Sequence, residues 1–145
     1  MSQRLPTGLD WTMPSELSRV DGICQETHAL LHAHQQAALV FTMDLLLREF
    51  LNNAIIHGNK NVHAKQVQAA LRIGRKWVVL RIRDEGRGFK WRKASQRLPD
   101  ETATSGRGLM IGKAYAGRMR YNQAGNEITL WIPKSTTPPC LSKHT

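Results

Sequence analysis

The sequence has few of the features that mark secreted, disulfide-bonded or membrane-spanning proteins. It contains 2 cysteines, Cys24 in an apolar-periodic stretch and Cys140 in a tail rich in Pro and Thr. Neither has a second Cys or a close His at the spacing of a zinc site, so we expect two free thiols. The longest apolar run, around residues 37–47, is interrupted by Thr42 and Asp44 and is too short to cross a bilayer. The first residues lack the apolar core of a signal peptide, and we expect a cytoplasmic protein without a membrane contact.

Acidic and aromatic residues are also scarce. The chain has 11 Asp and Glu against 21 Lys and Arg, a formal net charge of +10, and aromatic side chains make up 6%. This excess suggests an anionic partner, such as a nucleotide, a nucleic acid or an acidic protein surface. The basic residues are densest at residues 81–93 and 107–120, where they form either a solvated surface or the rim of a phosphate site. The 4 Trp residues are scattered at positions 11, 77, 91 and 131, so we expect no direct contact with nucleic acid.

The periodicity of the remaining residues predicts one domain over residues 1–134, of the α+β class. Apolar residues recur at three- and four-residue spacing up to residue 34 and again over residues 38–57, which predicts two helices, the first capped by Ser15. A weaker pattern predicts an edge strand at residues 9–12. Alternating apolar and polar residues predict four further strands: residues 67–71, 78–82, 118–122 and 127–132.

Between these strands the chain reads as a hairpin turn, a long loop and a third helix. The hairpin turn falls at residues 74–76, the irregular basic loop at residues 90–105 and the helix at residues 107–116. We expect the helices to lie on one face of a mixed, largely antiparallel sheet, with residues 135–145 as a flexible tail.

Three polar residues follow one another at intervals of four: Glu49, Asn53 and His57. This spacing places them on one side of a helix that is otherwise mostly apolar. Such a row is either a stripe that faces water or a site for a metal ion and proton transfer. An amide oxygen suits magnesium, and a nearby carboxylate can deprotonate a hydroxyl.

A second motif begins where the strand at residues 78–82 ends. Asp84 is followed by Gly86 and Gly88, which permit a sharp turn and the close approach of a ligand to the backbone. The Asp84 carboxylate offers only acceptors, which suits an amino group such as the exocyclic amine of adenine. Taken alone, the motif is also compatible with an ordinary Asp-x-Gly turn.

A third motif, Gly106, Arg107, Gly108 and Leu109, is a glycine-rich turn that opens a helix. Free N–H groups and the positive end of the helix dipole favour an anion there, and Arg107 adds a charged donor for a phosphate. An ordinary helix start has the same appearance.

The order and spacing of the three motifs resemble those of the GHKL ATPases, the superfamily of gyrase, histidine kinases and related chaperones. Residues 49–58 look like the N box of that superfamily, residues 84–89 like its first glycine box and residues 106–109 like its second. The resemblance covers residues 39–133. It implies a Bergerat-type α/β sandwich with an ATP lid at about residues 90–105.

The resemblance also implies roles for the motif residues. Asn53 would hold the magnesium that bridges the phosphates, and Glu49 would be the catalytic base. Asp84 would bind adenine and the glycines Gly86 and Gly88 would shape its pocket, while residues 106–109 would line the lid hinge near the phosphates of ATP or ADP. His57 matches a family position without a firm role.

Within the superfamily, the chain resembles the bacterial anti-sigma-factor serine kinases. That likeness implies a serine/threonine-protein kinase that phosphorylates a serine of an anti-sigma-factor antagonist and sequesters a sigma factor or an equivalent regulator, with a homodimer as one possible state. Two alternatives stay open: a non-catalytic ATP-binding switch, and a detached histidine-kinase-like ATPase domain.

Overall fold

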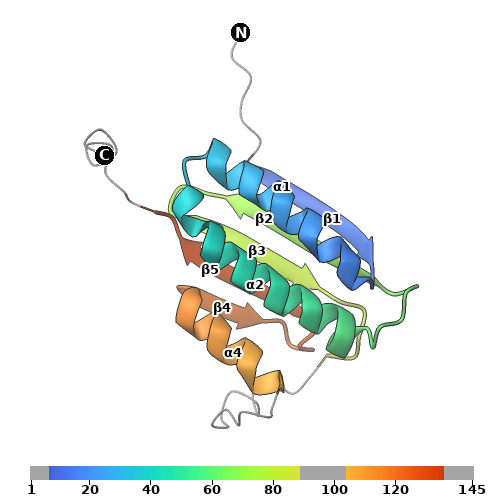
Figure 1. Cartoon of the computed structure of the whole chain (residues 1–145). Coiled ribbons are helices and arrows are strands. Elements are labelled where there is room, and N and C mark those ends of the chain that lie inside the picture. The colour runs from blue at the N-terminus through green and yellow to red at the C-terminus, as the bar shows by residue number, and fades with distance from the viewer. Residues whose placement is uncertain (1–6, 89–103, 136–145) are drawn as a thin grey trace, which may run out of the picture.

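The helices lie on one face of a single antiparallel sheet (Figure 1). The computed structural model describes residues 7–88 and 104–135, with only the backbone described for residues 104–109. The sheet has five strands in the order β1-β2-β3-β5-β4, and every adjacent pair is antiparallel. The strands are β1 (Gly8–Pro14), β2 (Gln66–Ile73), β3 (Trp77–Arg83), β4 (Arg118–Tyr121) and β5 (Glu127–Pro133). The α+β sandwich is confirmed, and its sheet is antiparallel throughout the described strands where a mixed sheet was expected.

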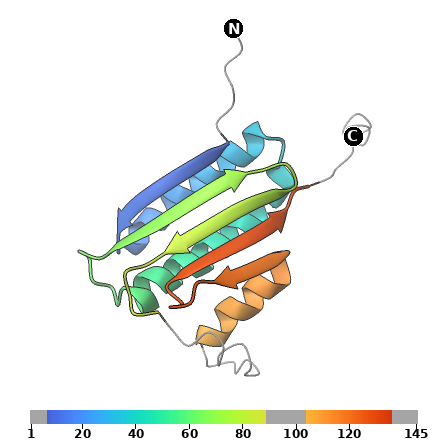
Figure 2. The ribbon, with the colours of Figure 1, turned by 180° about the vertical axis from the view of Figure 1, so that it is seen from behind.

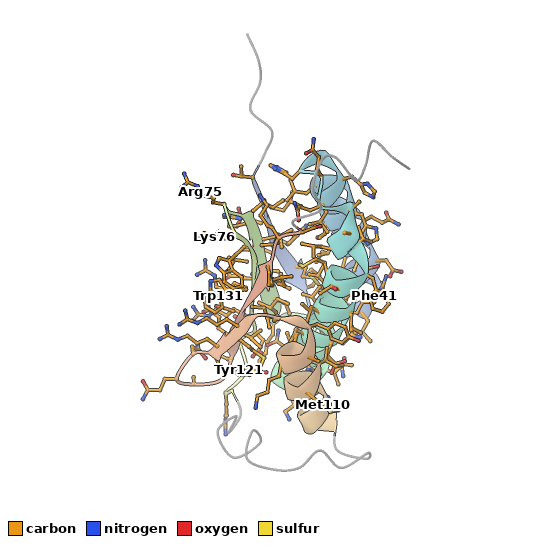
Figure 3. The ribbon with its side chains drawn as sticks, turned by 90° about the vertical axis from the view of Figure 1, so that its left-hand side faces the viewer. Phe41, Arg75, Lys76, Met110, Tyr121 and Trp131 are labelled. Carbon is orange, nitrogen blue, oxygen red and sulfur yellow. The ribbon has the colours of Figure 1, made fainter. Side chains whose placement is uncertain are left out.

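The alternation of apolar and polar residues sorts the sheet into two faces. In β2 the residues Val67, Leu71 and Ile73 are buried, and in β3 Val78 and Leu80 are buried, so these side chains face the helices. The residues that alternate with these along each strand are mostly polar and point to the other face of the sheet, which no described element covers (Figure 2). The side view separates the two layers: Trp131 lies on the sheet side and Phe41 on the helix side (Figure 3).

The first helix, α1 (Val20–Ala33), packs on the sheet beside α2 (Val40–Asn53). The predicted cap at Ser15 is wrong, because the Ser15 hydroxyl donates a hydrogen bond to the Lys65 carbonyl at 2.6 Å. A short 3-10 turn, η1 (Leu17–Arg19), precedes α1 and leaves Leu17 48% exposed.

The predicted helix over residues 38–57 is divided into three segments. It opens with a 3-10 turn, η2 (Ala37–Leu39), continues as α2, and ends in a π-helical segment, η3 (Ala54–Gly58). The Asn59 N–H donates to the Ala54 carbonyl at 2.8 Å, which closes this wider turn. π-Segments of this kind are frequent at functional sites.

The third helix, α4 (Thr104–Tyr115), begins three residues before the predicted start at residue 107. Gly106, which was expected ahead of the helix, therefore lies within its first turn. Most of the predicted lid, residues 90–103, lies outside the described residues, as do residues 136–145 of the predicted tail and Cys140. Ser135, the first tail residue, donates its N–H to the Gln36 side chain at 2.6 Å. No described helix is long and apolar enough to span a membrane.

Candidate functional site

A cavity of about 160 Å³ lies where α2 and η3 meet the ends of β3, β4 and β5. Its apolar wall is formed by Phe50, Ala54, Ile82 and Ile128. Asn53, Asp84 and Gly88, which sequence reasoning proposed from two separate motifs, all line it, and so does His57. The first two predicted motifs therefore meet in one apolar cavity with a few polar groups, the usual composition of a small-molecule site.

Asp84 is the half-buried acceptor of this cavity. Burial raises the pKa of its carboxyl above the usual value, while the Gly86 N–H and the charge of Lys65 act in the opposite direction. The Gly86 N–H donates to Oδ1 at 2.7 Å. Within the described residues the second oxygen, Oδ2, accepts no hydrogen bond. It can therefore accept one from an amino group of a ligand.

Three glycines allow the backbone to approach closely around Asp84. A Cβ atom on Gly58 would lie 2.3 Å from the Asp84 carboxyl group, and one on Gly86 would lie 2.2 Å from the Gly58 carbonyl oxygen. Gly88 has a φ of +83°, and a Cβ atom there would lie 1.8 Å from the Ala124 oxygen. Gly58, the last residue of the segment that resembles the N box, is thus required by the contact with Asp84.

Asn59 holds the Asp84 turn in place, a role that sequence reasoning missed. The side chain is completely buried. Its Nδ2 donates to the Ser15 hydroxyl at 2.9 Å and to the Gln66 carbonyl at 3.0 Å, and its Oδ1 accepts the Glu85 N–H at 2.7 Å. One side chain thereby joins the end of η3, the segment after β1, the start of β2 and the turn after β3.

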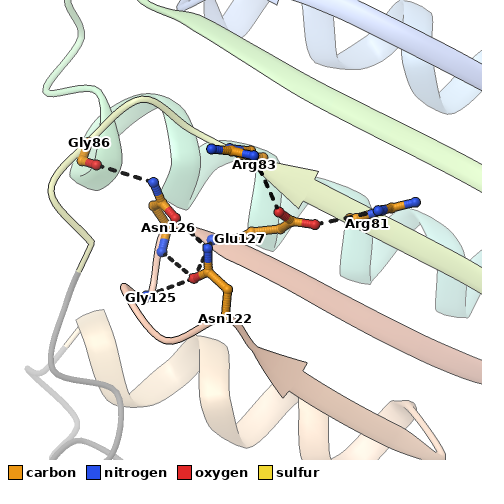
Figure 4. Close-up of polar contacts among 7 residues, drawn as sticks. All are labelled: Arg81, Arg83, Gly86, Asn122, Gly125, Asn126 and Glu127. Atoms are coloured by element: carbon orange, nitrogen blue, oxygen red, sulfur yellow. Dashed lines mark hydrogen bonds and ion pairs between the residues drawn. The ribbon is translucent and has the colours of Figure 1, made fainter.

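The turn between β4 and β5 forms the other side of the cavity (Figure 4). Asn122 Oδ1 accepts the N–H groups of Gly125, Asn126 and Glu127 at 2.8, 3.0 and 3.2 Å. The Asn126 carbonyl in turn accepts the Asp84 N–H at 2.9 Å, so the two turns are hydrogen-bonded to each other. The contact of this turn with the Asp84 turn was not predicted from the sequence; the cluster of Asn residues was the available signal.

Glu49 lies one helical turn before Asn53, and its charge acts on Tyr121. Burial raises the pKa of the Tyr121 hydroxyl, and the Glu49 carboxylate raises it further. Glu49 itself is half-exposed and does not line the cavity as Asn53 does. The Asn53 amide makes no hydrogen bond within the described part of the chain, which leaves its oxygen available to a ligand.

The third motif is described only in its backbone. Gly106, Arg107, Gly108 and Leu109 all lie in the first half of α4, and their side chains are outside the description. α4 packs against α2, and a Cβ atom on Gly112 would lie 2.3 Å from Met119 Sδ and 3.2 Å from Phe50. Gly112 thus lets α4 lie close to Phe50, one of the residues of the cavity wall.

The arrangement of the cavity agrees with a comparison against known protein families. The model of the histidine kinase-like ATPase domain matches residues 13–132, which is most of the chain and includes every described residue of the cavity. The chain belongs to this family. A search of curated proteins finds no significant match.

Membership of the histidine kinase-like ATPase family places the protein in the GHKL superfamily and supports nucleotide binding by this domain. The residues suit that role: the apolar wall can hold a purine ring, and Asp84 can accept its amino group. Magnesium also fits, because Asn53 offers a free amide oxygen and this ion commonly takes its remaining ligands from phosphates and water. The described residues contain no group of three His, Cys, Asp or Glu side chains that could hold a metal.

Proposed function

We propose that this ATPase domain is a serine/threonine-protein kinase and anti-sigma factor. It would phosphorylate a serine of an anti-sigma-factor antagonist and, with the same surface, hold a sigma factor or an equivalent regulator inactive. The observation that carries the proposal is the position of Glu49, one helical turn from Asn53, where its charge acts on Tyr121, a residue of the cavity lining. A protein that only bound ATP would have no evident need for a carboxylate there.

The proposed reaction is direct phosphoryl transfer. The serine oxygen of the antagonist attacks the γ-phosphorus, the bond to the leaving oxygen of ADP breaks, and the hydroxyl proton passes to the Glu49 carboxylate. Asp84 and the apolar wall would hold adenine, while Asn53 would orient the phosphates. Bound magnesium would offset the charge on the phosphate oxygens, with Asn53 as its protein ligand.

The partner switch would follow from the phosphorylation state of the antagonist. The unphosphorylated antagonist would compete with the sigma factor for the protein, and phosphorylation would release it. A homodimer is compatible with this scheme, and a cytoplasmic location is what it requires.

The experiment is transfer from labelled ATP and magnesium to antagonist proteins encoded in the same genome. The test variant is Glu49→Gln, which removes the base and keeps its shape. The matched control is Glu26→Gln, which removes a carboxylate from α1, where Glu26 accepts a hydrogen bond from Trp11 at 2.8 Å. We expect transfer by the wild type and the control, and a loss of roughly 10²–10⁴-fold in Glu49→Gln, the usual contribution of a general base. Equal transfer by the two variants would remove Glu49 from the mechanism.

A second candidate is an ATP-dependent switch that phosphorylates nothing. It is favoured by one observation: Glu49 does not line the described cavity. The same assay separates the two, because tight ATP binding without transfer to any antagonist supports the switch. A detached histidine-kinase-like domain would instead transfer phosphate to a histidine, which acid lability of the product would reveal.

A further inference from the structure

The face of the sheet opposite the helices is not covered by any described element (Figure 2). Its side chains are mostly basic among the charged residues. The register of the strands places five arginines on it and two carboxylates, Asp10 and Glu127. The arginines are Arg72 on β2, Arg81 and Arg83 on β3, and Arg118 and Arg120 on β4. We call these residues and the strands that carry them the open sheet face.

The guanidinium groups at the centre of the open sheet face are only partly neutralised. Arg81 and Arg83 share one carboxylate, Glu127, at 3.7 and 3.9 Å, and both side chains remain more than half exposed (Figure 4). Neither makes a hydrogen bond within the described residues. A guanidinium has five N–H donors that match a carboxylate in pairs, so both groups retain donors for further anions.

A hollow of about 280 Å³ lies beside these arginines. Ala70 stands in the sheet between Asp10 on β1 and Arg81 on β3, directly opposite each of them. Because the Ala70 side chain is short, the taller neighbours leave a depression there. The open sheet face therefore combines a positive charge with a depression that could hold part of a ligand, whereas an ordinary solvated surface carries charge alone.

The aromatic residues of the open sheet face favour a peptide over a nucleic acid. Trp77 and Trp131, far apart in sequence, lie on neighbouring strands of this face, which the sequence did not suggest. The Arg118 guanidinium lies 4.9 Å from the centre of the Trp131 ring and so occupies a ring face on which a base would stack. Trp77 is only 38% exposed and lies against Gly117 and Pro133. A second copy of this chain is disfavoured as well, because it would bring like charges together.

We propose that the open sheet face binds an extended acidic segment of a partner protein, whose carboxylates pair with Arg81 and Arg83 and whose chain lies over the Ala70 hollow. The proposal extends the function proposed above and rests on it for its regulatory meaning, since the partner would be one of the regulated proteins. Binding itself requires neither nucleotide nor catalysis.

The test uses the full chain and a fluorescein-labelled peptide of alternating Glu and Ser, with a Gln–Ser peptide as the uncharged reference. Binding is followed by fluorescence anisotropy in wild type and in the double variant Arg81→Gln/Arg83→Gln. The matched control is Arg19→Gln/Arg48→Gln, which removes the same charge from η1 and α2, on the helix side. Circular dichroism confirms that each variant is folded.

We expect the acidic peptide to bind and the Gln–Ser peptide not to bind. The Arg81/Arg83 variant should weaken binding about tenfold, since each exposed charge pair is worth up to roughly a factor of five, and the helix-side control should change it little. An equal loss in the Arg81/Arg83 variant and in the helix-side control would reduce the effect to net charge and overturn the proposal. So would the absence of peptide binding, or tighter binding of an oligo-dT strand at the same face.

Sedimentation of the same variants tests self-association. A wild-type dimer that dissociates in the Arg81/Arg83 variant would assign the face to a second copy and overturn the proposal. Failure of phosphoryl transfer would contradict the kinase function and leave the peptide result standing, so the two failures are distinguishable.

Discussion

Replacing Asn59 with alanine should lower the stability of the protein and its affinity for ATP together. Asn59 lines no part of the nucleotide cavity, yet its buried amide makes three hydrogen bonds, at 2.7, 2.9 and 3.0 Å. One of them holds the N–H of Glu85, the residue directly after Asp84. With alanine at position 59, the Ser15 hydroxyl, the Gln66 carbonyl and the Glu85 N–H each lose the hydrogen bond to Asn59. The turn that carries Asp84 is then no longer hydrogen-bonded to the end of η3.

The size of the effect follows from these three contacts. A hydrogen bond contributes about 1 kcal/mol net, and a buried group left without a partner costs somewhat more, so we expect a loss of about 3 kcal/mol in the free energy of unfolding. For a chain of this length that corresponds to a fall in Tm of about 10 °C. The matched control is Asn52→Ala, at a half-exposed position of α2 whose side chain makes no hydrogen bond within the described residues.

Thermal unfolding followed by circular dichroism, with and without ATP, measures both effects. We expect Asn59→Ala to melt well below Asn52→Ala and to gain less stabilisation from ATP at a temperature where both are folded. If the two variants melted together, the Asn59 network would not hold the turn. A lower Tm with unchanged ATP affinity would show that Asn59 supports the fold without positioning Asp84.

Three further predictions concern single side chains. Gly88→Ala should destabilise the protein by about 1–3 kcal/mol, because the φ of Gly88 is +83° and the added methyl group would collide with Ala124. Gly22→Ala, on α1 with open space around it, should instead stabilise the protein by up to about 1 kcal/mol. Chemical denaturation measures both free energies of unfolding. The pKa of the Asp84 carboxyl group is raised in the folded state. The protonated carboxyl therefore contributes its full stability at a pH below the pKa of the unfolded state, and this contribution is lost as the pH rises through the pKa of the folded state. Without ATP, Asp84→Asn should therefore gain stability relative to wild type between acidic and neutral pH, and melts that stay parallel would contradict this. Burial raises the pKa of Cys24 to about 11, so in a Cys140→Ser background iodoacetamide at mildly alkaline pH should leave the folded protein unmodified and label it after unfolding.

Local patterns predicted most of the fold. The hairpin of β2 and β3 and the closing strands β4 and β5 follow from the two-residue alternation, and even the weak pattern near residue 9 corresponds to β1. The boundaries of the helices were less predictable. A 3-10 turn and a π-segment replace one turn each of a predicted helix. The π-segment leads directly into Asn59, whose side-chain contacts are distant in sequence and leave no local pattern.

The site divides in the same way. Asn53, Asp84 and Gly88 could be predicted from the sequence, because their residue types and their spacing indicate what each can bind. All three line the same cavity. Asn59 was not found, because its partners Ser15 and Glu85 are 44 and 26 residues away, and no local pattern reports such contacts. The open sheet face was equally hidden: alternation places Arg81 and Arg83 outward, but only the strand order brings Trp131 and the arginines of β4 beside them.

The most direct test of the nucleotide site is calorimetric titration with ATP and with GTP, in wild type and in Asp84→Asn. Asp84 Oδ2 can accept a hydrogen bond from the amino group of adenine, whereas guanine presents a carbonyl oxygen at that position, which a carboxylate repels. We predict that wild type binds ATP and strongly disfavours GTP. We also predict that Asp84→Asn loses at least about tenfold in ATP affinity, as expected for a hydrogen bond to a charged group. Equal affinities for the two nucleotides, or an unchanged ATP affinity in Asp84→Asn, would contradict the assignment of this cavity as the adenine site.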